Sequence, residues 1–207
     1  MPPDPTVFVV DDDPAMRDSL RWLLQSVGLA VETFGAAEEF LTQYDATKPG
    51  CLVLDVRMPG MSGLKLQDVL AERHIRLPVI IITGYAEVPS AVRALKTGAI
   101  DFIEKPFSDE LLLDRIRQAI DTDRQMREAA AQRATVMERF ASLTSREREV
   151  MELVSAGKAN KVIAAELNLS PKTVEVHRAN VMKKMEVDSV AELVRASVLL
   201  SADEGKP

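Results

Sequence analysis

Acidic residues, a hydroxyl and a lysine follow short apolar runs in the first half of this sequence, at the points where the runs end. They are Asp11, Asp12 and Asp13, then Asp55, Thr83 and Lys105. Two carboxylates ~5 Å apart repel each other by roughly 3 kcal/mol at an effective dielectric constant of about 20, so a cluster of them requires a counter-ion. Carboxylate oxygens with no histidine or cysteine nearby favour Mg²⁺ or Mn²⁺.

These residue types fit one chemistry, the transfer of a phosphoryl group to a carboxylate. A carboxylate such as Asp55 can attack a phosphoryl donor and form an aspartyl phosphate. Lys105 would supply positive charge and Thr83 a hydrogen bond to the transferred oxygens. The pattern therefore predicts that Asp55 accepts a phosphoryl group, with Thr83 and Lys105 assisting.

The apolar runs that precede these residues read as strands separated by helices. The predicted strands are Thr6 to Val10, Ala30 to Phe34, Cys51 to Leu54, Pro78 to Ile82 and Ile100 to Ile103. Five strands alternating with helices indicate an α/β fold with a doubly wound parallel sheet. In such sheets ligands bind beyond the carboxyl ends of the strands, where the polar residues lie.

The first predicted helix shows the signals that bound such elements. Asp13 can cap it, Pro14 suits its first position and Gly28 ends it. Its apolar stripe is Met16, Leu20, Leu23, Leu24 and Val27. Trp22 lies off that stripe, so we expect it to be partly exposed.

The segment 123–140 joins the two halves of the chain. Ser108 can cap a helix that continues into an alanine-rich stretch without glycine or proline. We therefore expect a long linker helix, with a frayed linker as the alternative.

The last 67 residues predict four short helices. The first has a capping box at Thr144 and Glu147 and ends at Gly157. The second, 160–167, would bury Val162, Ile163 and Leu167. After a tight turn at 168–170, Ser170 and Pro171 start a third helix that runs to about Met185. The fourth begins at Ser189 with the stripe Val190, Leu193, Val194 and Ser197 or Val198. We expect domains at 1–122 and 141–200 and a disordered tail at 201–207.

The third of these helices has an unusual outer face. At ~100° per residue, Val174, Val181 and Met185 lie on the core side. The residues opposite or flanking are Lys172, Glu175, Val176, Ala179, Asn180 and Lys183. A small apolar ridge bordered by lysines and hydrogen-bonding groups suits the major groove of DNA, although periodicity alone also permits a solvated helix face.

Composition and charge agree with two domains. The chain has 207 residues, 46% of them hydrophobic, and its single cysteine, Cys51, excludes an intramolecular disulfide and suggests a core residue. No apolar run could span a membrane and no secretory signal is visible, so we expect a cytoplasmic protein. Residues 1–122 contain 12 basic and 19 acidic side chains, whereas 158–184 contain six basic and two acidic. This basic segment suggests a polyanion site.

Four segments of the first half resemble the signature blocks of receiver domains, in the same order. They are VVDDD at 9–13, LDVRMPG at 54–60, ITG at 82–84 and EKPF at 104–107. The resemblance covers roughly residues 5–122 and implies a flavodoxin-like receiver with Asp55 as the phosphoacceptor. It implies that Asp12, Asp55 and the Arg57 carbonyl bind the metal directly and Asp11 largely through water. It also implies a cis bond between Lys105 and Pro106.

The same resemblance implies a switch. Phe102 occupies the aromatic switch position of the family, next to Thr83. The surface formed by the helix 88–97 and the strand containing Phe102 pairs two receivers in the family, which implies a homodimer when the protein is phosphorylated. The partner that donates the phosphoryl group would be a sensor histidine kinase.

The second half resembles a LuxR-type DNA-binding domain over about residues 140–200. The match includes LTSREREVM at 143–151 and SPKTVEVHR at 170–178. It implies that the domain binds double-stranded promoter DNA and that Lys161 and Thr173 also contact the DNA. It further implies RNA polymerase as a partner. The whole chain is similar to the FixJ branch of the NarL/FixJ response regulators.

The sequence is compatible with three functions. The first is a phosphorylation-controlled transcription factor that is no enzyme beyond self-catalysed phosphotransfer and slow autodephosphorylation. The second is a phosphate-relay or protein-interaction module. The third is an aspartyl-phosphate hydrolase of the haloacid-dehalogenase type, which is weakened because position 57 is arginine where that chemistry needs a second acid.

Overall fold

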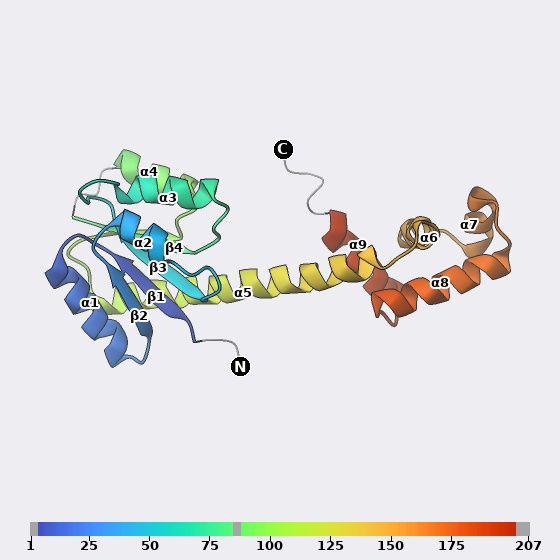
Figure 1. Cartoon of the computed structure of the whole chain (residues 1–207), viewed down its shortest axis with the longest axis horizontal. Helices are drawn as coiled ribbons and strands as arrows, with labels where there is room; N and C mark the ends of the chain where they lie inside the picture. The colour runs from blue at the N-terminus through green and yellow to red at the C-terminus, as the bar shows by residue number, and fades with distance from the viewer. Residues whose placement is uncertain (1–3, 85–87, 202–207) are drawn as a thin grey trace. The chain divides into compact units, whose positions relative to one another are not determined.

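A five-stranded parallel sheet forms the centre of the first half of the chain. The structure is a computed structural model that describes residues 4–84 and 88–201. Its strands are β1 (Thr6–Val10), β2 (Ala30–Phe34), β3 (Gly50–Asp55), β4 (Val79–Thr83) and β5 (Asp101–Glu104). The strand order is β2-β1-β3-β4-β5. Figure 1 shows the sheet with the helices around it. This order confirms the predicted doubly wound, flavodoxin-like sheet, with strand ends within one residue of those expected.

Helices cover both faces of this sheet. On one face α1 (Pro14–Ser26) and α5 (Asp109–Ala141) pack against alternate strand residues such as Val7 and Val9. On the other face α2 (Ala37–Gln43), α3 (Gly63–Glu72) and α4 (Val88–Lys96) pack against Phe8 and Val10. The central strands β1, β3 and β4 are buried on both sides, which explains why their sequences are continuous apolar runs rather than alternating ones.

The caps of α1 follow the sequence signals, while one end of its apolar stripe does not. The carboxylate of Asp13 accepts a hydrogen bond from the Ala15 amide at 2.9 Å. Trp22 is 73% exposed, as its position off the stripe predicted. Val27 was expected in the core but is exposed, because the helix ends at Ser26 and Val27 is already its C-cap.

The start of β3 is tied to the middle of α5. A side chain at Gly50 would bring its Cβ within 1.8 Å of the Thr6 carbonyl oxygen, so only glycine fits there. The Gly50 amide donates to the buried carboxylate of Asp123 at 2.8 Å. Arg127 also binds Asp123 and donates to three carbonyls of the loop before β3, those of Ala46, Thr47 and Lys48.

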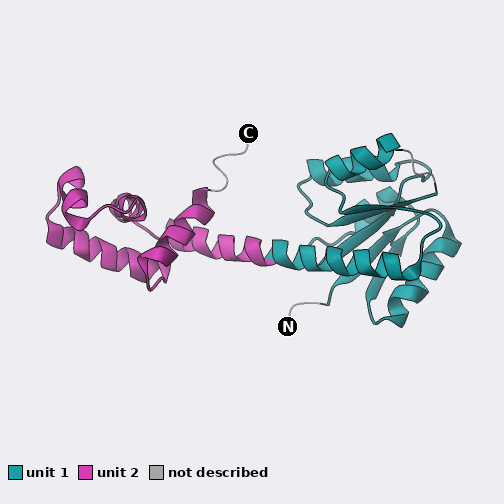
Figure 2. Cartoon of the chain, turned by 180° about the vertical axis from the view of Figure 1, so that it is seen from behind, with its two compact units in different colours: residues 1–127 teal, residues 128–207 magenta. Residues whose placement is uncertain are grey.

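The chain divides into two compact units, residues 1–127 and 128–207 (Figure 2). The helix α5 contributes to both, which confirms the predicted linker helix. The division falls after Arg127, whereas we expected the linker to begin at 123, because Asp123 and Arg127 bind the first unit. Of the helices in 4–84 and 88–201, none has the length and apolar character needed to cross a membrane.

The second unit is all-helical, as predicted. It contains α6 (Ser145–Ser155), α7 (Asn160–Leu167), α8 (Pro171–Met185) and α9 (Val190–Ser201). Their core includes Leu143, Val150, Ile163, Val174, Val181, Met185 and Leu193, with Val136 and Phe140 from the end of α5 packed against it. Ser201, which we expected to begin a disordered tail, is the last residue of α9, and 202–207 lie outside the described residues.

Two expectations about this core were wrong. Val162 is 45% exposed because Ile163 and Leu167 share a face that lies about 100° or more away from it. On α9, where Ser197 and Val198 were alternatives, Ser197 is half-buried, whereas Val198 is 64% exposed because it lies ~140° around the helix from Leu193. Val190 is also exposed, and Ala196 and Leu200 take the predicted places in the core.

Candidate functional site

Two acidic residues stand where the topology of the sheet changes direction. Asp11 follows β1 and Asp55 ends β3, and these neighbouring strands pair with Val10 opposite Leu54. Chain connections leave this point toward opposite faces of the sheet, and ligands of open α/β sheets bind at such points. Both carboxyl groups are nonetheless buried, with Asp11 1% and Asp55 6% exposed.

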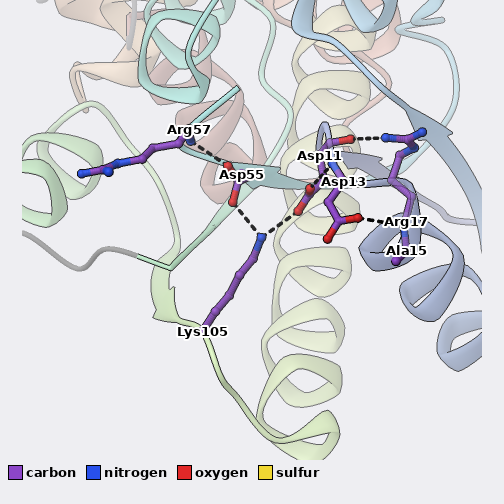
Figure 3. A network of polar contacts seen from close by, with 7 residues as sticks. All are labelled: Asp11, Asp13, Ala15, Arg17, Asp55, Arg57 and Lys105. Carbon is purple, nitrogen blue, oxygen red and sulfur yellow. Dashed lines mark hydrogen bonds and ion pairs between the residues drawn. The ribbon is translucent and has the colours of Figure 1, made fainter. Parts of the chain in front are cut away.

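The ammonium group of Lys105 lies between the two carboxylates (Figure 3). Its Nζ is 2.7 Å from Asp11 Oδ2 and 2.7 Å from Asp55 Oδ1. The Lys105-Pro106 peptide bond that follows β5 is cis, as the resemblance to receivers implied. Residues 94 and 50 positions apart in the sequence therefore meet, in the arrangement expected from the ends of β1, β3 and β5.

Backbone groups engage the remaining carboxylate oxygens. The amide of Asp13 donates to Asp11 Oδ1 at 2.9 Å, and the amide of Arg57 donates to Asp55 Oδ2 at 2.6 Å. Arg17 donates from Nη1 to the carbonyl oxygen of Asp11 at 2.7 Å (Figure 3). Each carboxylate is thus held in one orientation. This role of Arg17 was not predicted from the sequence. The only feature of the sequence that points to it is the position of Arg17 one helical turn after Asp13.

The charges in the site shift each other's proton affinity. Burial raises the pKa of Asp55 above its usual value, and the nearby Asp11 carboxylate adds to this, although Lys105 opposes both. Burial alone would lower the pKa of Lys105, but its hydrogen bonds to Asp11 and Asp55 outweigh burial, so its pKa is raised. Lys105 therefore remains a cation throughout the neutral range.

The other residues expected at this site occupy different positions. Asp12 is exposed, Asp13 caps α1, and the Arg57 side chain is exposed. Thr83 is buried at the end of β4, opposite Glu104 in register. Phe102 is half-buried and packs against the core on the α2, α3 and α4 face of the sheet. The structure therefore brings Asp11, Asp55 and Lys105 into direct contact, and leaves Asp12 at the surface beside them.

The donor set suits a hard divalent cation. An ammonium already bridges the two carboxylates, which shows that their shared position attracts positive charge. The groups around this position are carboxylate oxygens, which are the ligands that Mg²⁺ prefers. Mg²⁺ in such sites also keeps several water ligands. Within 4–84 and 88–201, no three histidine, cysteine or acidic side chains form a group that could hold a metal by themselves. A cation at this edge would thus need water or carbonyl ligands besides.

The loop after Asp55 is held from two sides. A Cβ at Gly63 would lie 2.1 Å from the Asp55 carbonyl oxygen, so glycine is required where α3 begins. Glu38 in the first turn of α2 accepts a hydrogen bond from the Met61 amide at 3.1 Å. Sequence reasoning missed Glu38, because its partner lies 23 residues away and is a main-chain group.

In the second unit, α8 presents the outer face expected of it. Val174, Val181 and Met185 are buried, whereas Val176 is 55% exposed. The remaining exposed members of the predicted face are Lys172, Glu175, Ala179, Asn180 and Lys183, and Lys161 is exposed on α7. Thr173 is half-buried and bonded to the cap residue Ser170. An apolar side chain thus projects to solvent between basic and polar neighbours.

A buried carboxylate near the start of α6 was identified from the sequence only as a helix cap. Glu147 is 4% exposed and completes the capping box with Thr144. Its Oε2 also accepts from Lys184 of α8 at 2.6 Å. The hydrogen bond from Lys184, together with those from Thr144, lowers the pKa of Glu147 to about 2.

Comparison with known proteins gives matches along almost the whole chain. Residues 7–117 match the response regulator receiver domain, and residues 141–197 match the luxR family of bacterial regulatory proteins. Nodulation protein W of Bradyrhizobium diazoefficiens is 49% identical over 94% of this chain and 86% of its own length. The transcriptional regulatory protein FixJ of Azorhizobium caulinodans is 45% identical over 100% of both chains.

Solved structures agree with these matches. The response regulator StyR is 45% identical, covers 95% of this chain and 99% of its own, and superposes with a TM-score of 0.84. Full-length FixJ from B. japonicum is 44% identical over 96% of this chain and 98% of its own, with a TM-score of 0.57.

The contacts of Glu147 predict a pH-dependent contribution to the stability of the second unit. Its pKa is about 2 in the folded chain against an ordinary 4.5, so the unfolded chain binds the proton first as the pH falls. The stabilisation is therefore complete above pH 4.5 and is lost as the pH falls toward 2. We expect Glu147→Gln to destabilise α6 by about 1–2 kcal/mol at pH 7. Hydrogen exchange of the α6 amides should show the two proteins converging at low pH.

Glu149→Gln is the matched control, because Glu149 pairs with Arg146 on the surface and both side chains are nearly half exposed. It should change exchange by little at any pH. An equal difference between wild type and Glu147→Gln at pH 7 and pH 3 would contradict the prediction.

Proposed function

Because the chain belongs to the FixJ-like response regulators, which join a receiver domain to a LuxR-type DNA-binding domain and regulate transcription, we propose that phosphorylation of Asp55 by a sensor histidine kinase controls its dimerisation and its binding to promoter DNA. One observation carries the proposal. The Lys105 ammonium lies 2.7 Å from both Asp11 and Asp55, at the carboxyl ends of the central strands.

Phosphorylation at Asp55 would proceed by in-line transfer. A carboxylate oxygen of Asp55 attacks the phosphorus, the bond from phosphorus to the donor breaks, and an aspartyl phosphate forms. Lys105 offsets the negative charge of the transferred group, and the Thr83 hydroxyl donates a hydrogen bond to it. Asp11, Asp12, Asp55 and the Arg57 carbonyl would hold Mg²⁺, which when bound supplies further positive charge at the site. The chain is then an acceptor and regulator, with slow loss of the phosphate.

The switch proposed from the family position of Phe102 would carry the signal to the receiver surface. Binding of Thr83 to the phosphoryl group would let the half-buried Phe102 turn inward. The adjacent helix α4 exposes three apolar side chains, Val88, Val92 and Leu95, at 76%, 46% and 49%. We propose that this face pairs two copies of the chain.

The DNA-binding function would reside in α8. Exposed Val176 and Ala179 suit thymine methyl groups, while Glu175 and Asn180 offer hydrogen bonds to base edges. Lys161, Lys172, Thr173 and Lys183 would contact phosphates or bases at the borders of that face. Promoter DNA and, through it, RNA polymerase are the partners, and the protein acts in the cytoplasm.

Asp55 should take up one phosphoryl group from a small acyl phosphate or a cognate kinase in the presence of Mg²⁺. Intact-mass measurement should show one added phosphate that is absent in Asp55→Asn and after chelation. Asp12→Ala should also block uptake, because it removes a ligand of the divalent cation. Labelling that persists in Asp55→Asn would rule out this assignment.

Phosphorylation should convert the protein from mainly monomer to dimer in sedimentation experiments with acyl phosphate. Phe102→Ala should accept the phosphate yet shift less, because the switch lacks its aromatic ring. Two recognition helices would then meet half-sites ~10 base pairs apart. If phosphorylated protein binds operator DNA tightly as a monomer, release of a masked DNA-binding face would explain activation better.

Lys183→Ala should weaken DNA binding broadly and lower the salt slope of binding by about one, because the variant neutralises one phosphate fewer. Substitutions of Val176 or Glu175 should instead change base preference, by about 1–3 kcal/mol for each base that is no longer recognised. Fluorescence anisotropy over a range of salt concentrations separates the two effects. Unchanged affinity and slope in Lys183→Ala would show that α8 meets DNA in another orientation.

A further inference from the structure

The C-terminal end of α8 is bound by side chains from two other helices of the second unit. We call this group the α8 clamp and define it as Arg139 of α5, Glu147 of α6, and Lys184 and Glu186 at the end of α8. None of its members belongs to the outer face of α8 described above.

Arg139 binds the end of α8 twice. Its Nη1 donates to the carbonyl oxygen of Met185 at 3.3 Å, and its Nη2 forms an ion pair with Glu186. The last carbonyls of a helix have no partner within it, so Arg139 satisfies one of them. Glu186 has a φ of 51°, a left-handed conformation usually given to glycine. A glutamate at this position provides the carboxylate that Arg139 binds.

Glu147 holds the neighbouring lysine of α8. Its Oε2 lies 2.6 Å from Lys184 Nζ, which also reaches the Ser142 carbonyl at 3.4 Å. Glu147 is buried and is itself fixed by the Thr144 amide at 2.8 Å. Lys184 is therefore paired within the unit although its side chain is 37% exposed, whereas the adjacent Lys183 is exposed on the outer face.

Packing brings the same elements together. Val136 and Phe140 of α5 contact the core to which Val181 and Met185 of α8 belong. In the middle of α8, Arg178 donates to Asn160 of α7 at 2.6 Å. The helix is thus bound to α7 at its middle and to α5 and α6 at its end, where Val181 and Met185 also anchor it in the core. Removal of the clamp would leave only this apolar packing to set the orientation of the C-terminal end.

We propose that Arg139 and Glu147 are positioning residues for DNA recognition. They fix the C-terminal end of α8 so that its outer face meets base edges, and they keep Lys184 away from DNA phosphates. This inference rests on the proposed binding of DNA by α8. Base recognition tolerates little displacement, whereas a long lysine side chain can follow a phosphate. Removal of the clamp should therefore reduce discrimination between sequences more than general affinity.

The test uses the full-length chain and two duplexes, one selected from a random pool by the wild-type protein and one of scrambled sequence. Arg139→Gln should lower the ratio of the two affinities about tenfold, the effect of a single mismatched base, with the salt slope unchanged. Arg139→Lys should restore most of the ratio, because an ammonium can still bind the Met185 carbonyl and Glu186. Arg146→Gln removes the same charge from a surface pair and should leave the ratio unchanged.

The two adjacent lysines give a second, matched comparison. Lys183→Gln should lower the salt slope by about one on both duplexes. Lys184→Gln should leave the slope unchanged and lower the affinity ratio. All measurements are made well below the melting temperature of each variant, so that fraction folded does not enter the ratio.

Each outcome decides between the proposals. If Arg139→Gln lowers only the melting temperature and keeps the affinity ratio, the clamp is structural and the inference is wrong. If Lys184→Gln lowers the slope as Lys183→Gln does, Lys184 contacts phosphate and the inference is also wrong. If the wild-type chain shows no salt-dependent binding to either duplex, the proposed DNA-binding function fails, and the positioning role fails with it.

Discussion

The first unit depends on one shared cation, the ammonium of Lys105 between the carboxylates of Asp11 and Asp55. Two carboxylates cannot be buried side by side without a positive charge to offset their repulsion. That requirement ties the ends of β1, β3 and β5 to each other, although these residues are far apart in the sequence. A phosphoryl group arriving at Asp55 would meet a lysine that is already in place, so little rearrangement is needed before the charge of the transferred group is offset.

The second unit also contains a buried carboxylate whose charge is offset by a residue from another element. Glu147 is buried because Lys184 of α8 and the backbone of Thr144 bind it. In both units an acidic side chain at the end of a strand or the start of a helix takes its counter-charge from a distant element. The net charge of −6 says nothing about these local balances, since acidic residues are concentrated in 1–122 and basic ones in 158–184.

The parallel sheet and the meeting of Asp11, Asp55 and Lys105 could be predicted, because parallel strands must bring their carboxyl ends to one edge. The flavodoxin-like order of the strands came instead from the resemblance to receivers. Caps such as Asp13 and Thr144 could be predicted because their partners are two or three residues away. Arg17, Arg127 and Arg139 could not, since each binds main-chain carbonyls, which every residue carries. The carbonyls that Arg127 binds lie 79 to 81 residues from it. The burial of Val162 was predicted wrongly, because the helical period gives the direction of each side chain but not how much of the helix surface is covered by the core.

The buried position of Cys51 has a practical consequence for measuring this protein. It is the only cysteine of the chain, it lies wholly within the sheet, and burial raises the pKa of its thiol to about 12. The thiolate that reacts with maleimides and disulfides is therefore scarce at neutral pH. The native chain should behave toward thiol reagents as if it had no cysteine. Spectroscopic labels can then be attached at cysteines introduced on the surface while the native sequence is kept at position 51.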